Sequence, residues 1–219
     1  MDRSRREVRD TYDEIAAHFS QTREHAWPDV ATFVETAPRV RRALDLGCGN
    51  GRHAELLADR ADRVLGLDIS RGLLAEARAR AAGRGFDLDL LEGDAATVPL
   101  RDGVVGLAVY VAALHHLPDR ETRVASLDEL ARVLGADGRA LVSVWSTTHD
   151  AFDRTEGFDT TVDWTLPGGE TVPRYYHIYD PDEFDADVAA SDLRVERTYV
   201  SAGNCYAEVG GRGRPYSTN

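Results

Sequence analysis

The amino-acid sequence predicts a single α/β domain built as a three-layer sandwich of helices around one central sheet. Short apolar runs alternate with helical stretches, which is the pattern of parallel strands joined by right-handed crossovers. The runs are continuously apolar, as expected when helices cover both faces of the sheet. A chain of 219 residues with 42% hydrophobic residues suits one large domain with a substantial core. We therefore expect a Rossmann-like sheet of seven mostly parallel strands that ends in a C-terminal antiparallel hairpin.

A helical cap is expected over residues 1–38. Apolar residues at spacings of three and four predict a first helix over residues 3–22. Pro28, a residue favoured in the first turn of a helix, starts a second helix that ends near Ala37.

The central core is expected over residues 40–146. Its strands are the short apolar runs 43–46, 64–68, 88–91, 104–111 and 139–145. The helices between them are expected at 52–58, 70–83 and 122–134. Ser70 can cap the second of these helices, and Gly135 and Gly138 close the third.

The remaining segments follow this core. Residues 147–173 are polar and contain Gly157, Pro167 and the pair Gly168-Gly169, so we expect an inserted loop that can act as a lid. Residues 174–210 are expected to supply the last helix and the closing hairpin, the helix at 181–190 and the strands at 193–200 and 205–209. The tail after Gly210 is expected to fray.

The charge balance leaves two interpretations open. Acidic residues number 38 and basic residues 26, all of them arginine, which gives a net charge of −12. Such a charge repels nucleic acid at ordinary salt concentrations, which favours a protein without a polyanionic partner. The alternative is a salt-adapted (halophilic) host, in whose cytoplasm screening shortens the range of this repulsion. The charge therefore does not exclude RNA.

Other features of the composition narrow the class of protein. No stretch has the roughly 18 uninterrupted apolar residues of a membrane span, and the N-terminal residues are charged where a signal peptide is apolar. Cys48 and Cys205 are too few for a disulfide framework or a four-ligand zinc site, so no metal is expected. We expect a cytoplasmic protein that has no contact with membranes.

A glycine-rich turn follows the first strand of the core. Its residues are Gly47, Cys48, Gly49, Asn50 and Gly51, and glycines there let a ligand approach the backbone. A bare strand-to-helix turn would look similar. The fingerprint of a dinucleotide site requires Gly or Ala where Arg52 stands, and no phosphate-binding GxxxxGK[ST] loop is present. The turn therefore favours a nucleoside ligand without phosphates.

Two carboxylates extend this site along the sheet. Asp68 ends the second strand, where an acid can accept hydrogen bonds from both ribose hydroxyls, and Asp94 follows the third strand, where it can accept from an adenine amine. Each alone is as well explained as a cap or a turn residue. Because the carboxyl ends of parallel strands meet at one edge of a sheet, three such features in succession predict one nucleoside pocket.

With these motifs, residues 40–146 resemble the class I S-adenosylmethionine-dependent methyltransferases. The resemblance implies S-adenosylmethionine as cofactor. It also implies a set of cofactor-binding residues, namely Gly47, Cys48, Gly49, Asn50, Asp68, Ile69, Asp94, Ala95 and Ala112. A narrower resemblance, to the wobble-uridine tRNA carboxymethyl methyltransferases, rests on residues 12–23, Trp27-Pro28, His115-His116, residues 120–124, Trp145 and residues 174–179.

The narrower resemblance implies methylation of 5-carboxymethyluridine in the tRNA anticodon loop to the methyl ester. A carboxylate with a pKa of about 4 is already ionised, so this reaction needs no strong general base. The expected catalytic residues are Arg23, His116 and Arg123, and the expected substrate-binding residues are His115, Arg120, Arg174 and Tyr176. Trp27, Trp145, Tyr175 and Tyr176 are candidates for stacking on the base. Alternatively, Arg123 pairs with Glu121 or Asp119 at the surface, and the tryptophans belong to the core.

The resemblance also implies a partner, because eukaryotic members of this family work with a small zinc-binding activator subunit. The strand within residues 86–92 is expected at the sheet edge, where such a subunit can add a strand and form a heterodimer. The main alternative function is a small-molecule O-methyltransferase that uses His115 or His116 as a base. A non-catalytic cofactor-binding scaffold and a nicotinamide oxidoreductase are weaker alternatives.

Overall fold

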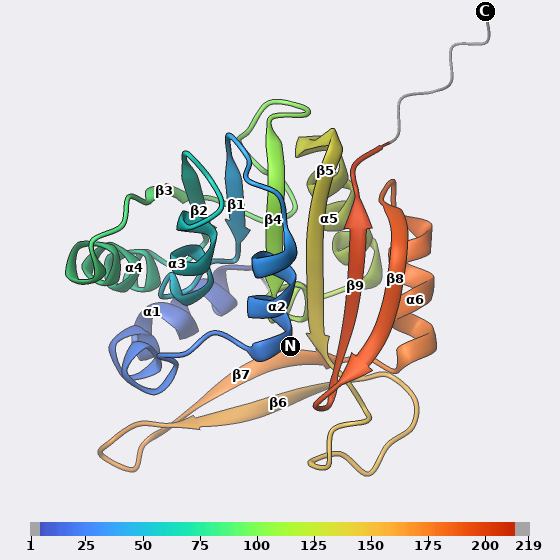
Figure 1. Cartoon of the computed structure of the whole chain (residues 1–219). Helices are drawn as coiled ribbons and strands as arrows, with labels where there is room; N and C mark the ends of the chain where they lie inside the picture. The colour runs from blue at the N-terminus through green and yellow to red at the C-terminus, as the bar shows by residue number, and fades with distance from the viewer. Residues whose placement is uncertain (1–4, 213–219) are drawn as a thin grey trace, which may run out of the picture.

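The computed structural model describes residues 5–212 and confirms the predicted α/β sandwich (Figure 1). Its main sheet has seven strands in the order β3-β2-β1-β4-β5-β9-β8. Their bounds are β1 Ala43–Leu46, β2 Val64–Asp68, β3 Asp89–Glu92, β4 Val105–Val111, β5 Leu134–Trp145, β8 Arg194–Ser201 and β9 Asn204–Gly210. Strand β9 runs antiparallel to both of its neighbours, and the strands from β3 to β5 are parallel.

Helices cover both faces of the sheet. In Figure 1, α2 (Pro28–Thr36) and α3 (Arg52–Ala58) lie in front of the sheet, and α5 (Arg120–Val133) and α6 (Pro181–Ala190) lie behind it. Helix α4 (Arg71–Arg84) flanks the β3 edge, and α1 (Arg5–Thr22) packs against α4. Of the first predicted helix, residues 3 and 4 lie outside the described residues, as does the tail from residue 213.

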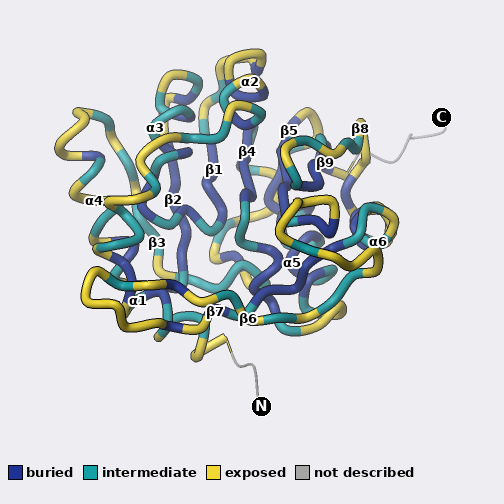
Figure 2. Tube along the Cα trace, turned by 90° about the horizontal axis from the view of Figure 1, so that it is seen from below, coloured by how far each residue is buried: buried dark blue, intermediate teal, exposed yellow. Residues whose placement is uncertain are grey.

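The core fills the space between these layers (Figure 2). One apolar cluster joins Leu127, Leu130 and Phe184 of the rear helices to the sheet, and another joins Phe33 and Leu57 of the front helices to the other face. Because strands β1 and β2 are buried along their whole length, their continuous apolar pattern follows from burial on both faces.

Local sequence signals start the helices as expected. The side chain of Ser70 accepts a hydrogen bond from the backbone N–H of Leu73, and Asp119 and Asp180 cap α5 and α6 in the same way. The β8–β9 hairpin turns at Ala202 and Gly203, which both have positive φ (47° and 74°). The predicted four-residue connection is therefore a two-residue turn, since Ser201 and Asn204 already pair.

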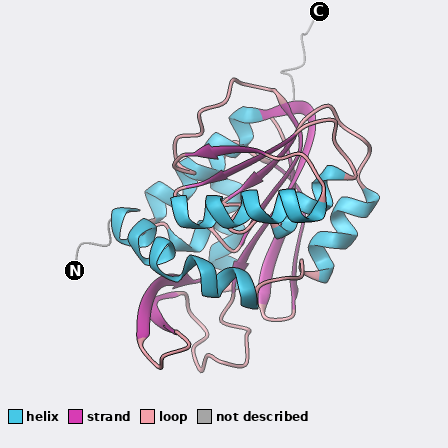
Figure 3. Cartoon of the chain, turned by 90° about the vertical axis from the view of Figure 1, so that its left-hand side faces the viewer, coloured by secondary structure: helices cyan, strands magenta, loops and turns pink. Residues whose placement is uncertain are grey.

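The expected loop over residues 147–173 is wrong in its main part. Strands β6 (Phe158–Thr165) and β7 (Thr171–Ile178) form a separate antiparallel hairpin, and β7 extends into the segment assigned to the C-terminal helix. Figure 1 shows this hairpin beneath the C-terminal ends of β4 and β5, and Figure 3 shows it from the side. One face of the hairpin is exposed and mostly polar, and the residues of the other face pack on α1. Because the polar face dominates the average composition of the segment, the sequence has the composition of a loop.

The predicted edge position of the third strand is confirmed, because β3 pairs only with β2 among the described strands. Leu88 and Leu90 lie against Gly66 of β2. Ion pairs join Asp89 to Arg63 and Glu92 to Arg71 along the outer part of this edge. None of the helices in the described chain is long and apolar enough to cross a membrane.

Candidate active site

A cavity opens at the C-terminal ends of the central strands, and residues of α1 and of β7 also line it. All nine residues predicted to bind the cofactor line it, and so do Arg23, His115, His116, Arg174 and Tyr176. Gly47 shows why the turn after β1 requires glycine. Its φ is +70°, and a Cβ at this position would overlap the Cβ of Ala113. The backbone of the turn is therefore open to a ligand that a side chain would exclude.

Asp68 shapes this turn and faces the cavity. Its Oδ2 accepts a hydrogen bond from the backbone N–H of Gly49 at 2.8 Å, and its Oδ1 accepts one from Ser70 at 2.9 Å. Burial raises the pKa of Asp68 above its usual value, and these two amides oppose that shift. Each oxygen has a further lone pair for a ribose hydroxyl, so the residues present fit an adenosyl ligand.

Asp94 lies farther along the same cavity, after β3. Its Oδ1 accepts a hydrogen bond from the backbone N–H of Ala96 at 2.9 Å, and its Oδ2 forms an ion pair with Arg5 of α1. Asn50 also lines the cavity, and its Nδ2 donates to the carbonyl of Arg23 at 2.9 Å. The Asn50 side chain thus fixes the segment after α1 against the glycine turn.

His116 belongs to a buried polar cluster on the other side of the cavity. Its Nδ1 lies 2.8 Å from the carbonyl oxygen of Tyr175 and must donate to it, so Nε2 accepts from the Tyr12 hydroxyl at 2.9 Å. Burial lowers the pKa of His116 to about 4. The imidazole is therefore neutral near pH 7 and has a single defined tautomer.

Arg174 supplies the positive charge of this cluster. Its Nη1 donates to the Tyr176 hydroxyl at 2.6 Å, and its guanidinium lies over the rings of Trp164 and Tyr176 at 4.8 and 5.1 Å. The hydroxyls of Tyr176 and Tyr12 are 3.5 Å apart. Within the described chain, Arg174 forms no ion pair with a carboxylate. The cavity wall thus carries a buried cation without a protein counterion.

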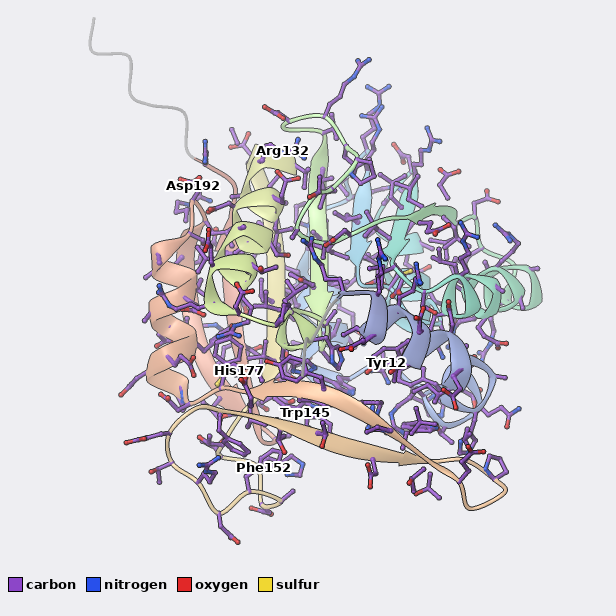
Figure 4. All side chains as sticks on the ribbon, turned by 180° about the vertical axis from the view of Figure 1, so that it is seen from behind. Tyr12, Arg132, Trp145, Phe152, His177 and Asp192 are labelled. Carbon is purple, nitrogen blue, oxygen red and sulfur yellow. The ribbon has the colours of Figure 1, made fainter. Side chains whose placement is uncertain are left out.

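His115 also lines the cavity, although its side chain is fully buried. Its Nδ1 accepts the backbone N–H of Trp145 at 3.0 Å, which leaves the proton on Nε2. Nε2 is buried and has no hydrogen-bond partner among the described residues. Burial, together with His116 nearby, lowers the pKa of His115 well below its usual value. Tyr176 stacks on Trp145 at 4.8 Å between ring centroids, and Figure 4 labels Trp145 beside the hairpin and Tyr12 on α1.

Arg123 and Arg120 do not line the cavity. Arg123 is 3% exposed, lies 3.8 Å from Asp187 and 3.6 Å from Glu183 of α6, and stacks over Tyr179. Arg120 pairs with the same Asp187 at 2.6 Å. The expected catalytic and substrate-binding positions of these two residues are therefore not supported, because α5 directs both side chains towards α6. The alternative pairing of Arg123 with Glu121 or Asp119 is not observed either.

Several residues of the cavity were not predicted as site residues. Tyr12 and Arg5 of α1 are two of these, and Trp164 of β6, which does not line the cavity, packs on α1. Trp164 donates through Nε1 to Nδ1 of His18 at 3.1 Å, across 146 residues of sequence. The alternation of Val162, Trp164 and Leu166 was the available signal for this strand.

Comparison with known proteins finds similar methyltransferases. Residues 44–142 match the family described as "Methyltransferase domain". The chain is 33% identical over 178 residues to the Saccharomyces cerevisiae tRNA (carboxymethyluridine(34)-5-O)-methyltransferase, covering 76% of this chain and 59% of the yeast protein. It is 35% identical over 175 residues to an Encephalitozoon cuniculi protein named as a methyltransferase, covering 77% and 78% of the two chains.

Vertebrate relatives are much longer. A Mus musculus tRNA (carboxymethyluridine(34)-5-O)-methyltransferase is 35% identical over 146 residues, which cover 67% of this chain and 21% of the mouse protein. The chain therefore spans about a fifth of the length of that relative.

Solved structures show the same fold. A complex of DhpI with S-adenosylhomocysteine (SAH) has a TM-score of 0.71 at 21% identity and covers 96% of this chain and 97% of DhpI. A complex of the Haloferax volcanii Trm112 methyltransferase activator with a methyltransferase has a TM-score of 0.68 at 18% identity, covering 95% and 99%. With its glycine turn, its two carboxylates and these relatives, the chain belongs to the class I S-adenosylmethionine-dependent methyltransferases.

Proposed function

We propose that this enzyme methylates the carboxylate of 5-carboxymethyluridine at the wobble position of tRNA and so forms the methyl ester. The yeast and mouse relatives carry this activity in their names, at 33% and 35% identity. The charge distribution of the cavity supports the same substrate class.

One observation about the cavity supports this substrate most strongly. Apart from the residues assigned to the cofactor, the cavity contains cationic and neutral side chains but no general base. Arg23 and Arg174 line it and form no ion pair within the described chain. His116 is neutral, with both nitrogens engaged, and His115 presents an N–H rather than a lone pair. Such a site suits a nucleophile that is already ionised when it binds, and a carboxylate is ionised at neutral pH.

The protein then has to orient the substrate carboxylate and does not have to deprotonate it. The bound cofactor supplies an electrophilic methyl group, and its transfer to a carboxylate forms one C–O bond, breaks one C–S bond and moves no proton. Arg174 and Arg23 hold the carboxylate through their planar guanidinium groups, while Nε2 of His115 donates to the substrate. The Tyr12–His116 pair fixes the floor of the site, and Trp145 contributes an aromatic face for the base. Proximity and alignment supply most of the acceleration.

A small zinc-binding activator subunit is proposed as partner, docking on the β3 edge. Support comes from the exposed edge of β3 and from the fold shared with the Haloferax volcanii methyltransferase, whose structure contains an activator. The resulting heterodimer would act in the cytoplasm, and the net charge of −12 suits a salty one. Co-purification of the tagged chain tests this, and an active chain with nothing bound contradicts it.

Incubation with labelled S-adenosylmethionine and total tRNA, with and without the activator, tests the substrate. Nucleoside analysis should find the label in the methyl ester of a modified uridine. Alkali should hydrolyse this ester and release the label as methanol. Arg174→Met should lower kcat/KM for tRNA by roughly 10- to 100-fold, since it removes a charged hydrogen-bond donor, whereas Arg39→Met at an exposed site should not. Label in a small molecule and in no RNA would overturn the proposal in favour of a metabolite O-methyltransferase.

A further inference from the structure

Trp164 of β6 contacts both of the cations that hold the substrate carboxylate in the proposed reaction. The centre of one of its rings lies 5.1 Å from the guanidinium carbon of Arg23, and the distance to that of Arg174 is 4.8 Å. Arg23 directly follows α1 and Arg174 belongs to β7, so the two side chains reach the cavity from different elements. Trp164 itself does not line the cavity. It therefore contacts the two arginines from outside the cavity.

The two guanidinium groups act on the same part of the cavity wall. Burial raises the pKa of the Tyr176 hydroxyl, and the positive charges of Arg174 and Arg23 both oppose that shift. Arg174 also donates to this hydroxyl at 2.6 Å. In the part of the chain that the structure describes, neither arginine pairs with a carboxylate. Because two neighbouring cations repel each other, another group has to keep them together before the substrate binds.

The indole ring of Trp164 can hold both cations without neutralising them. The face of an aromatic ring attracts cations, and tryptophan attracts them more strongly than tyrosine or phenylalanine. Trp164 is 6% exposed, and this attraction is stronger where the groups are shielded from water. A carboxylate in the same place would form ion pairs with the arginines and compete with the substrate. A neutral ring leaves the positive charge of both groups available to an anion.

The orientation of this ring is fixed from α1. The indole Nε1 of Trp164 donates to Nδ1 of His18 at 3.1 Å. The ring also packs on Phe19, with 5.6 Å between the ring centres, and belongs to an apolar cluster that contains Tyr12 and Ile15. A rotation of the indole would leave its buried N–H without an acceptor, which is unfavourable. The ring face that the arginines contact is therefore set by the packing of β6 against α1.

We propose that Trp164 is a positioning residue for methyl transfer, whose indole ring holds the guanidinium groups of Arg23 and Arg174 where they bind the carboxylate of the methyl acceptor. This role rests on the proposed function, because it requires an anionic acceptor. The carboxylate loses its charge when it becomes the ester, so the two cations favour the bound substrate over the product. Trp164 therefore acts mainly on the affinity for the substrate and less on the methyl-transfer step.

The test compares two RNA stem-loops that differ only in the wobble nucleoside, which is 5-carboxymethyluridine in one and its methyl ester in the other. Fluorescence anisotropy would measure their binding to the complete chain in the presence of SAH. We expect the wild type to prefer the carboxylate RNA. Trp164→Leu should weaken binding of this RNA by roughly 10- to 30-fold and leave binding of the ester RNA unchanged. In methylation assays the KM for the carboxylate RNA should rise by a similar factor, whereas kcat should fall by less than about threefold.

Two further variants separate positioning from packing. Trp164→Phe retains an aromatic face and should recover most of the preference for the carboxylate RNA. Ile15→Ala removes buried apolar contacts from the same cluster at a residue that does not line the cavity. It should lower the melting temperature and leave the preference for the carboxylate RNA unchanged.

An equal loss of binding for both RNAs in Trp164→Leu would overturn the proposal, because Trp164 would then act only through packing. Unchanged binding of both RNAs would overturn it as well. In either case the proposed function stands as long as the wild type methylates the carboxylate RNA. A wild type that forms no ester on this RNA would overturn the proposed function, and the role of Trp164 with it.

Discussion

The hydroxyl of Tyr12 lies 2.9 Å from Nε2 of His116, and this contact joins the N-terminal helix to the short helical turn after β4 across 104 residues of sequence. Both residues are buried, and the second nitrogen of His116 is bound to a carbonyl of β7. One imidazole therefore links α1, the main sheet and the separate hairpin at the cavity. Because that imidazole is neutral, it holds these elements together without adding charge to the site.

Loss of the Tyr12 hydroxyl should therefore destabilise the chain. Tyr12→Phe leaves Nε2 of His116 buried without a donor, and we expect the free energy of unfolding to fall by about 1–3 kcal/mol. Denaturant unfolding followed by circular dichroism measures this. An unchanged midpoint would mean that water replaces the hydroxyl and that the pair does not hold α1 in place.

Cofactor affinity should increase with pH through the titration of Asp68. Burial raises the pKa of this carboxyl in the free protein, whereas ribose hydroxyls donate to its ionised form and lower the pKa in the complex. Binding therefore releases protons, and SAH should bind more weakly near about pH 5 than near about pH 8. Calorimetry in buffers of different ionisation enthalpy detects the released protons. Asp68→Asn should bind weakly at both pH values, and a pH dependence equal to that of the wild type would refute the assignment.

Arg123 should matter for stability rather than for cofactor binding. Arg123→Met leaves the fully buried Asp187 with Arg120 as its remaining cationic partner, and we expect a loss of about 1–3 kcal/mol in the free energy of unfolding. The double variant Arg123→Met with Asp187→Leu should recover much of this loss, since no unpaired charge is then buried. SAH affinity of the folded variants should equal that of the wild type; a selective loss of binding would return Arg123 to the site.

Two glycines with positive φ should respond differently to alanine. Gly47→Ala combines a φ of +70° with an overlap on Ala113, so cofactor binding should be lost and the melting temperature should drop. Gly85→Ala has a similar φ of +76° but nothing within 4 Å of the new Cβ. It should cost only about 1 kcal/mol of backbone strain. Calorimetric binding and thermal unfolding of the two variants provide the comparison, and equal effects would contradict it.

Asp45 should make the protein less stable as the pH rises. Burial raises its pKa from the usual 3.8 to about 7 in the folded state, so the folded state binds this proton more tightly than the unfolded state. Its contribution is complete below about pH 4 and is lost as the pH rises through about 7. Between about pH 5 and pH 8, Asp45→Asn should gain on the order of 2–4 kcal/mol relative to the wild type. Parallel unfolding curves at both pH values would contradict this.

The sequence determined the sheet, the glycine turn and the two carboxylates. These depend on local rules, because an apolar run sets each strand and the turn after it places Gly47, Asp68 and Asp94 at one edge of a parallel sheet. The tertiary structure alone decided the rest of the site. It brought Trp164 to His18 and Tyr12 to His116, revealed the β6–β7 hairpin and turned Arg123 away from the cavity. Such contacts join residues far apart in the chain, and their partners follow from the packing of whole elements rather than from any spacing in the sequence.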